Sequence, residues 1–512
     1  MSVGQAIHKS KINGKRAGRL FVYLHSLFLI MRLINLPVIS RIQGIIALVE
    51  VAALILCIPV AYYYNEPAFP FMFSILVCLL LSAVLFLLSA GADLKAFTHK
   101  DGFLSVAIAW ILFSALGSLP FLFSGVMKNA ADAFFESASG FTTTGASVLR
   151  DVEILPRSIL FWRSLTHWIG GLGIIVLVII ILPNFMPNTY SLFSMESSLK
   201  EKFHPRTSAI GYRLLFIYIG LTLLEILLLY LGDMDLFESI CHTFGTVATG
   251  GFSTRNASIG AFSDYSKVII MIFMFLSGIS FVVYYQLLKR NFRKVKNNEE
   301  LWFYLAVCII AGIFAVSVLV AQSGMTFRKA FLEGFFQVVS IITTTGYATA
   351  DYLNWPAPGL LLIFLLFFTG ASSGSTTGGI KMARHLVVLK NISDIFKKLI
   401  HPNAVSQIKL NGKILEQEVN TTVISFVVLY LFIFLISSVI LSVTGVNDLL
   451  TSASAAASAL GNIGPGFGSI GPAYNYAHFT PLTKTILSLL MIFGRLELMT
   501  FIVLFTPAFW KK

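Results

Sequence analysis

The sequence predicts an all-α polytopic membrane protein with four M1–pore helix–M2 repeats around a central pore, preceded by two extra N-terminal transmembrane helices. Three observations support this fold class. The 512 residues are 56% hydrophobic and only 12% charged, a balance that excludes a soluble domain. Apolar runs of about 20 residues, each long enough to cross a bilayer, recur along the whole chain. Between paired runs, a shorter semi-polar segment ending in glycine and hydroxyl residues occurs four times, which indicates an internal repeat.

The net charge of +13 is distributed in a way that argues against a nucleic-acid partner. Basic residues cluster in short loops between apolar runs, as the positive-inside rule expects of cytoplasmic loops. The clearest clusters are Lys289–Lys296 and Lys397–Lys413. We therefore expect the lipid bilayer as a partner, no nucleic acid, and cytoplasmic N- and C-termini.

The chain divides into six predicted regions. Residues 1–40 form a basic N-terminal extension, read as an interfacial amphipathic helix with a signal peptide as the alternative. Residues 41–100 hold the two extra transmembrane helices. The pore repeats are predicted at 101–190, 205–296, 300–400 and 415–512, and the runs at 266–288 and 482–507 are among their membrane spans.

The four semi-polar segments align on Gly145, Gly251, Gly346 and Gly464 without a gap. An acid stands 13 residues before the glycine in the first three copies, at Asp132, Glu238 and Glu333. An acid there is expected near the N-terminus of a short helix, where the helix dipole favours negative charge. The fourth copy has Thr451 at this position, and its nearest acid is Asp448.

The segments TTGAS, TGGFS, TTGYA and NIGPG, at 143–147, 249–253, 344–348 and 462–466, are predicted to form a cation selectivity filter. Glycine takes a positive φ without a steric penalty, so it lets successive carbonyls turn toward one axis. Carbonyl oxygens of this kind replace the hydration shell of potassium in the loops of potassium channels. A divalent-selective pore would be expected to carry a ring of carboxylates, which these segments lack. The predicted ion-binding residues are Thr143, Thr144, Gly145, Thr249, Gly250, Gly251, Thr344, Thr345, Gly346, Asn462, Ile463 and Gly464.

Long sequence stretches outside the filter also resemble one family. They include DAFFESASGFTTTGAS, HWIGGLGIIV, GGFSTRNASIG, GSTTGGIK, HPNAVSQIKL and FGRLELMTFIVLFTPAFW. On these residues the chain resembles the TrkH subunits of bacterial potassium uptake systems, in the Trk/Ktr/HKT superfamily. The resemblance implies potassium uptake across the bacterial inner membrane, a homodimer, and a cytoplasmic TrkA-type nucleotide-binding regulatory subunit. Potassium would be the transported ion, and we expect no organic cofactor on this chain.

The stretch GASSGSTTGG, at 370–379, interrupts an apolar run and has two readings. Glycines four residues apart are typical of close helix packing in membranes. Alternatively, consecutive small and hydroxyl residues unwind the helix, and the family resemblance implies such an intramembrane gating loop below the filter. The residues assigned to this gating loop are Gly370, Gly374, Ser375, Thr376, Thr377, Gly378 and Gly379.

Two charged or titratable residues in the apolar runs were also assigned. Arg495 lies within the last run, where a charge is costly and usually faces a partner or a cavity. It is read as a positive barrier beside the pore, a role that the family pattern also implies, with a structural pair to Glu497 or a helix end as the alternative. His167 is expected to be a packed or interfacial residue without a metal or proton role.

Other classes of function fit the sequence less well. No Walker A sequence and no nucleophile–base pair is present, so we predict that the chain is not an enzyme. The G-x-G-x-x-G match at 466–471 follows no strand and is not expected to bind a dinucleotide. A secondary transporter for an organic solute, or a membrane-anchored interaction protein, remains the alternative to a cation pathway.

Overall fold

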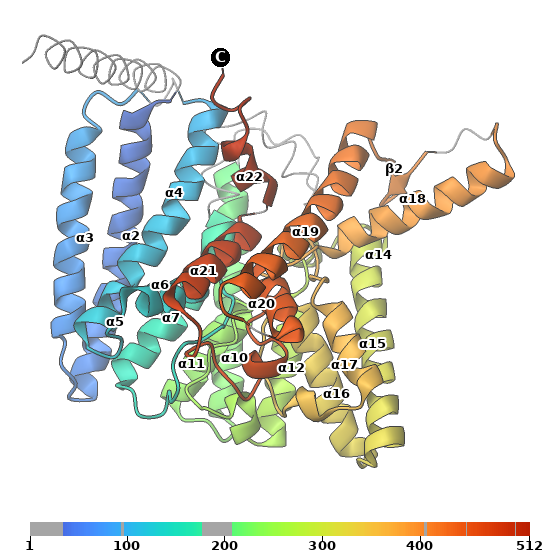
Figure 1. Cartoon of the computed structure of the whole chain (residues 1–512), viewed down its shortest axis with the longest axis horizontal. Coiled ribbons are helices and arrows are strands. Elements are labelled where there is room, and N and C mark those ends of the chain that lie inside the picture. The colour runs from blue at the N-terminus through green and yellow to red at the C-terminus, as the bar shows by residue number, and fades with distance from the viewer. Residues whose placement is uncertain are drawn as a thin grey trace, which may run out of the picture.

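The computed structural model describes residues 34–93, 97–176, 207–403, 407–446, 448–496 and 498–511. Its elements are nearly all helical, and they stand side by side in the arrangement that Figure 1 shows. The predicted N-terminal extension lies outside the described residues up to position 33, as does the end of the apolar run at 158–183. The all-α fold class is confirmed.

Two antiparallel helices precede the repeats, α2 (Leu36–Tyr63) and α3 (Phe69–Leu88). The side chain of Asn35 accepts a hydrogen bond from the Val38 amide and so starts α2, with Pro37 in the first turn, where its missing N–H costs nothing. Only 22% of the apolar window of α3 is buried inside the chain. This leaves most of its leucines and phenylalanines for lipid, while α2 packs between α3 and the first repeat.

Each repeat contains a first helix, a short pore helix and a second helix, and in the second, third and fourth repeats the second helix is broken. The elements of the first two repeats are α4 (His99–Gly117), α5 (Leu119–Phe123), α6 (Ala130–Phe141), α7 (Arg157–Val176), α10 (Thr207–Tyr230), α11 (Leu236–Val247), η3 (Ser258–Ala261), α12 (Asp264–Ser277), α13 (Phe281–Leu288) and α14 (Phe292–Lys296). Those of the last two are α15 (Glu299–Ser323), α16 (Phe327–Ile342), η4 (Tyr352–Asn354), α17 (Ala357–Leu366), α18 (Met382–Ile400), α19 (Gln417–Val443), α20 (Leu449–Gly461), η5 (Gly468–Ile470), α21 (Pro481–Arg495), α22 (Leu498–Ile502) and η6 (Val503–Phe505). A two-residue antiparallel hairpin, β1 (Lys409–Leu410) and β2 (Lys413–Ile414), separates the third repeat from the fourth.

Six described helices are long and apolar enough to cross a membrane, or up to eight if each bent helix pair counts as one span. The pore helices are shorter, and each of α6, α11 and α16 packs between the second helix of its own repeat and the second helix of the preceding one. For α6 the preceding repeat is the fourth, through α21. This cyclic packing closes the four repeats around a common centre.

The apolar runs at 266–288 and 482–507 are each divided between two helices. The first bends by 89° between α12 and α13, and the second bends by 114° after Arg495. At the first break, the Phe281 amide donates to Gly374 O at 3.1 Å, and Gly278 O accepts from the Ser372 amide at 3.0 Å. The helix breaks because its main-chain groups at this point bond to another segment instead of to the next turn.

The acids before the filter glycines do not all stand where the alignment placed them. Asp132 and Glu238 lie in the first turns of α6 and α11. Glu333 does not, because α16 begins at Phe327 and is longer than the other pore helices. In the fourth repeat, Asp448 takes over this role as the N-cap of α20 and accepts from the Thr451 amide at 2.9 Å.

Candidate functional site

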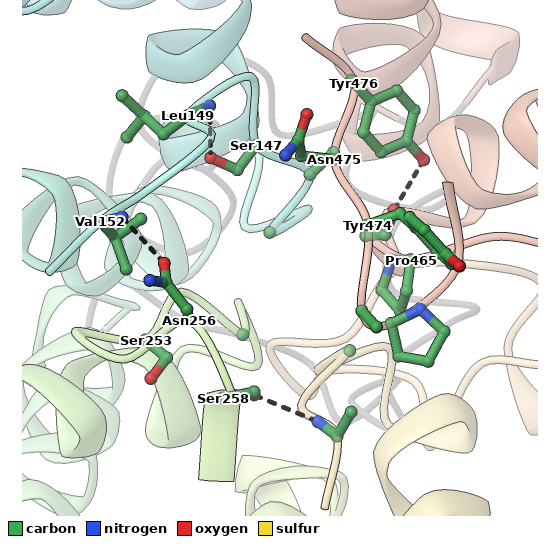
Figure 2. A pocket seen from close by; sticks show the side chains of 18 of the residues that line it. Ser147, Leu149, Val152, Ser253, Asn256, Ser258, Pro465, Tyr474, Asn475 and Tyr476 are labelled. Atoms are coloured by element: carbon green, nitrogen blue, oxygen red, sulfur yellow. Dashed lines mark hydrogen bonds between the residues drawn. The ribbon is translucent and has the colours of Figure 1, made fainter. Parts of the chain in front are cut away.

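The four glycine-containing segments meet at one place. A cavity of about 150 Å³ is lined by Gly145, Gly251, Gly346 and Gly464, one from each repeat. Figure 2 shows loops of all four repeats around this open cavity, with Ser147, Ser253, Pro465 and Tyr476 near its wall. Segments that are about a hundred residues apart in sequence therefore share a single centre.

The four glycines and four carbonyl oxygens interlock in a closed ring. At each glycine, the position that a Cβ atom would occupy is already taken by a carbonyl oxygen of the next segment. This oxygen belongs to the residue directly before that segment's own glycine. In chain order the pairs are Gly145 with Gly250, Gly251 with Thr345, Gly346 with Ile463, and Gly464 with Thr144. The last pair returns to the first repeat and closes the ring, so no side chain can be added at any of the four glycines without moving a neighbouring segment.

The main chain of the four segments repeats one unusual conformation. The glycines have φ values of 82°, 82°, 78° and 104°, in the left-handed region. The residues two positions earlier are left-handed as well, with φ values of 53° to 57° at Thr143, Thr249, Thr344 and Asn462. Such values are strained for the β-branched threonine, and strain of this kind concentrates at functional sites. The sequence predicted these residues as ion ligands but did not indicate their positive φ, because nothing in a threonine signals a left-handed conformation.

Several oxygens in this ring are left without hydrogen-bond partners. Among the described residues, no donor is found for the carbonyls of 143–145, 249, 251, 344–346 and 462–463. Gly464 O differs, since it accepts from the Tyr476 hydroxyl at 2.7 Å. The buried side-chain oxygens Thr143 Oγ1 and Asn462 Oδ1 also lack a donor there. Buried carbonyls are normally paired, so a set of unpaired ones gathered at one centre can ligate a cation.

Tyrosines and one asparagine join neighbouring segments. The Tyr347 hydroxyl donates to Phe252 O at 3.0 Å, and the Tyr352 hydroxyl donates to Gly466 O at 2.6 Å. Between the fourth and first repeats, Asn462 Nδ2 donates to Thr144 Oγ1 at 3.0 Å. The segments are thus held to each other as well as to their own pore helices.

The stretch 367–381 is not helical, so the close-packing reading of its glycines is wrong for this chain. This stretch contacts the filter segments at residues before their glycines, and none of its residues is among those that line the cavity. The Gly378 amide donates to Thr344 Oγ1 at 2.8 Å, and Thr376 Oγ1 lies 3.3 Å from Thr249 Oγ1. A Cβ atom on Gly378 would overlap Gly461 O beside Asn462. Three of the four segments are therefore in contact with this stretch.

Arg495, the last residue of α21, is buried next to the same stretch. Its guanidinium donates through Nη1 to Thr376 O at 2.5 Å and through Nη2 to Gly170 O at 3.2 Å. The alternative partner Glu497 lies outside the described residues. The arginine thus connects α7, α21 and the stretch below the ring.

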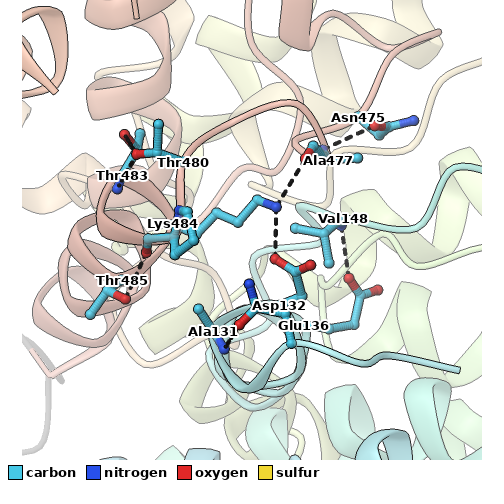
Figure 3. A network of polar contacts seen from close by, with 12 residues as sticks. Ala131, Asp132, Glu136, Val148, Asn475, Ala477, Thr480, Thr483, Lys484 and Thr485 are labelled. Carbon is cyan, nitrogen blue, oxygen red and sulfur yellow. Dashed lines mark hydrogen bonds and ion pairs between the residues drawn. The ribbon is translucent and has the colours of Figure 1, made fainter. Parts of the chain in front are cut away.

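Two ion pairs near the cavity were not evident from the sequence. Of the described residues that line the cavity, none is acidic. The lining residue Arg255 pairs with Glu238, its Nε lying 2.8 Å from the carboxylate. Figure 3 shows a second pair, in which buried Lys484 of α21 reaches Asp132 of α6 at 2.7 Å and Ala477 O at 2.9 Å. A lysine within an apolar run was a usable signal, because such a charge requires a partner.

Comparisons with known proteins agree with one another. The family model TrkH, described as a cation transport protein, matches residues 68–512. The Trk system potassium uptake protein TrkH of Salmonella typhimurium is 37% identical over 487 residues, covering 93% of this chain and 99% of that protein. The protein of the same name from Escherichia coli K12 is 39% identical over 424 residues, covering 81% and 86%. The crystal structure of the potassium transporter TrkH from Vibrio parahaemolyticus superposes with a TM-score of 0.85 at 32% identity, covering 93% of this chain and 99% of that one.

Proposed function

Because the chain belongs to the TrkH family of cation transport proteins, we propose that it takes up potassium ions across the bacterial inner membrane through a filter of main-chain carbonyls. The observation that carries this proposal is the closed ring of four glycines and four carbonyls around one centre. Relatives named as potassium uptake proteins match 81% to 93% of the chain and support the choice of ion.

The chemistry of the ring suits a monovalent cation. The donor-free carbonyls of the four segments, with the hydroxyl of Thr143 and the amide oxygen of Asn462, can replace the water of a potassium ion. Neutral oxygens bind a single charge weakly enough for the ion to leave again. An inside-negative potential then drives uptake with about 2.3 kcal/mol per charge per 100 mV. Potassium is the cargo in this scheme, and the chain itself supplies no organic cofactor.

The stretch 370–379 is the proposed gate. It lies under three of the four segments, and an ion leaving the ring toward the cytoplasm meets it first. Arg495 adds a positive charge there and holds Thr376 O in place. Arg495→Gln should remove both the charge and part of the restraint, so rubidium uptake should rise severalfold at equal abundance. Unchanged or lower uptake would refute the barrier role.

The cytoplasmic face offers a surface for the regulatory subunit that the family resemblance implies. The segments 288–300 and 390–413 meet there, since the Glu299 amide donates to Asn411 Oδ1 at 2.8 Å and Lys390 pairs with Glu299. We propose that a TrkA-type subunit docks on this basic surface, on a homodimer whose chain termini face the cytoplasm. Arg290→Glu with Lys413→Glu should abolish co-purification with that subunit, and retained co-purification would refute this surface.

The function is tested by growth and flux. The gene should restore growth of a potassium-uptake-deficient bacterium at low potassium, and cells should accumulate radioactive rubidium in competition with potassium more than with sodium. Gly145→Arg and Gly346→Arg would place a long cation across the ring and should abolish both effects. Rescue by either variant at normal abundance would overturn the proposal.

A further inference from the structure

Helix α7 places two buried side chains, one helical turn apart, between the first and second filter segments. Arg163 and His167 stand four residues apart and so share one face of the helix. Their exposed fractions are 4% and 0%. Both reach pore helix α6 on one side and the residues just after Gly251 on the other, and we call this pair the α7 bracket.

The contacts of His167 fix its ring. Nδ1 lies 2.7 Å from Gly140 O, which can only accept, so Nδ1 carries the proton. Nε2 then accepts the Phe252 amide proton at 3.2 Å, which requires a neutral ring. The imidazole also stacks on the Phe252 ring, with centroids 4.0 Å apart. One side chain thus ties the end of the first pore helix to the exit of the second segment.

Arg163 makes the same connection one turn away. Its Nε donates to Glu136 Oε1 at 2.6 Å, and its Nη1 donates to Ser253 O at 2.9 Å. The guanidinium lies 3.5 Å from the centroid of the Phe252 ring. Glu136 in turn accepts from the Val148 amide at 2.9 Å, behind the first segment. The ion pair is fully buried, so each charge depends on the other for its stability.

The second segment needs this support because it lacks the support that the first and third contain. In those two segments the hydroxyl of the threonine directly before the glycine is hydrogen-bonded to the threonine hydroxyl two residues earlier. The distances are 2.7 Å between Thr144 and Thr142 and 2.8 Å between Thr345 and Thr343. The second segment has Ala248 and Gly250 at the matching positions. A Cβ atom on Gly250 would overlap the His167 ring, so the imidazole occupies the space of the missing side chain.

We propose that the α7 bracket is a positioning unit that sets the second filter segment and thereby contributes to the choice between potassium and sodium. This inference rests on the proposed function. Arg163 borders the cavity and His167 does not. Neither is one of the predicted ion ligands; both hold the main chain of 251–253, so that the carbonyls of Thr249 and Gly250 keep their distance from the axis. Carbonyls that are held less firmly can move closer to a smaller ion. Loss of the bracket should therefore strengthen the binding of sodium more than that of potassium.

The experiment is a double-mutant cycle with His167→Ala, Gly250→Ala and the double variant, all compared with the unmodified chain. Rubidium uptake gives KM and maximal rate, and sodium inhibition gives the selectivity.

Gly250→Ala should lose uptake about tenfold or more because its methyl group overlaps the imidazole, and His167→Ala should restore much of that loss. His167→Ala alone should keep its maximal rate within about twofold while sodium inhibits it severalfold more strongly. Thr222→Val on α10, which removes the hydroxyl that bonds to Trp168 Nε1 and Tyr218 O and keeps the side-chain volume, is the matched control and should leave sodium inhibition unchanged.

Thermal midpoints of the same proteins in detergent separate this inference from the proposed function. Gly250→Ala should lower the midpoint by several degrees, and less so in the His167→Ala background. If the unmodified chain carries no rubidium, the proposed function fails, while the coupling between the two positions still tests the contact. Additive midpoints, or sodium inhibition of His167→Ala equal to that of the unmodified chain, would overturn the bracket.

Discussion

The first and third filter segments differ from the second in the source of their support. In the first and third, a pair of threonine hydroxyls two residues apart braces the main chain from within. In the second, the brace comes from His167 and Arg163 of a neighbouring repeat. Yet Thr143, Thr249 and Thr344 have nearly the same φ, between 53° and 57°. One strained conformation is therefore reached in two ways, which shows that the conformation, and not the particular side chains, is the common requirement.

The largest expected effect concerns what all four segments share. Gly346→Ala should lower rubidium uptake by about tenfold or more, equivalent to about 1.4 kcal/mol, because its methyl group would overlap Ile463 O. Gly125 has a similar φ of 74°, with open space around it. Gly125→Ala therefore carries the same backbone strain without the overlap and should retain most uptake. Equal uptake by the two variants would show that the ring is not closed as described.

A second prediction separates the two kinds of brace. Thr345→Val removes the hydroxyl pair of the third segment, at a cost of about 1 kcal/mol, and should raise sodium inhibition of rubidium uptake severalfold. Combined with His167→Ala, the two changes should multiply, because they act on different segments through separate contacts. If the double variant were no worse than either single one, the segments would share one brace, and the distinction drawn here would be wrong.

Hydrogen bonds between segments should contribute less to the protein's stability and uptake than the hydrogen bonds that support each segment. Tyr352→Phe removes the hydrogen bond to Gly466 O and should lower the thermal midpoint in detergent by an amount equivalent to about 1 kcal/mol. Tyr474 at the cavity wall is 61% exposed, so Tyr474→Phe is a suitable control. A larger loss for the exposed tyrosine would contradict this ranking.

The smallest effect is expected at the start of a pore helix. Hydrogen bonds from Thr451 hold the pKa of Asp448 below its ordinary value of 3.8. A lowered acid pKa stabilises the fold above the ordinary value, and this contribution is lost as the pH falls through the lowered one. Asp448→Ala should thus lower the midpoint near neutral pH by the equivalent of at most about 1 kcal/mol, with the difference shrinking in acid. A difference that grows on acidification would have the wrong sign.

Much of this arrangement could be predicted from the sequence, because repetition carries the information. The aligned glycines Gly145, Gly251, Gly346 and Gly464 predicted four equivalent segments, and the structure brings all four to one cavity. Helix breaks were not predictable at 278–280, because hydropathy does not report that a main-chain amide bonds to a distant loop. Glu136 and Arg163 were overlooked for a related reason. Each is a single charge in an apolar run, and only the fold shows that the two meet.

The Ala–Gly pair of the second segment has a consequence for how the proposed pore can change. A pore assembled from four identical subunits must accept every substitution in quadruplicate. Here each quarter is encoded separately, and the quarters are already supported by different side chains. A single codon can therefore alter one quadrant and leave three as they are, so ion preference can drift in small increments instead of large jumps.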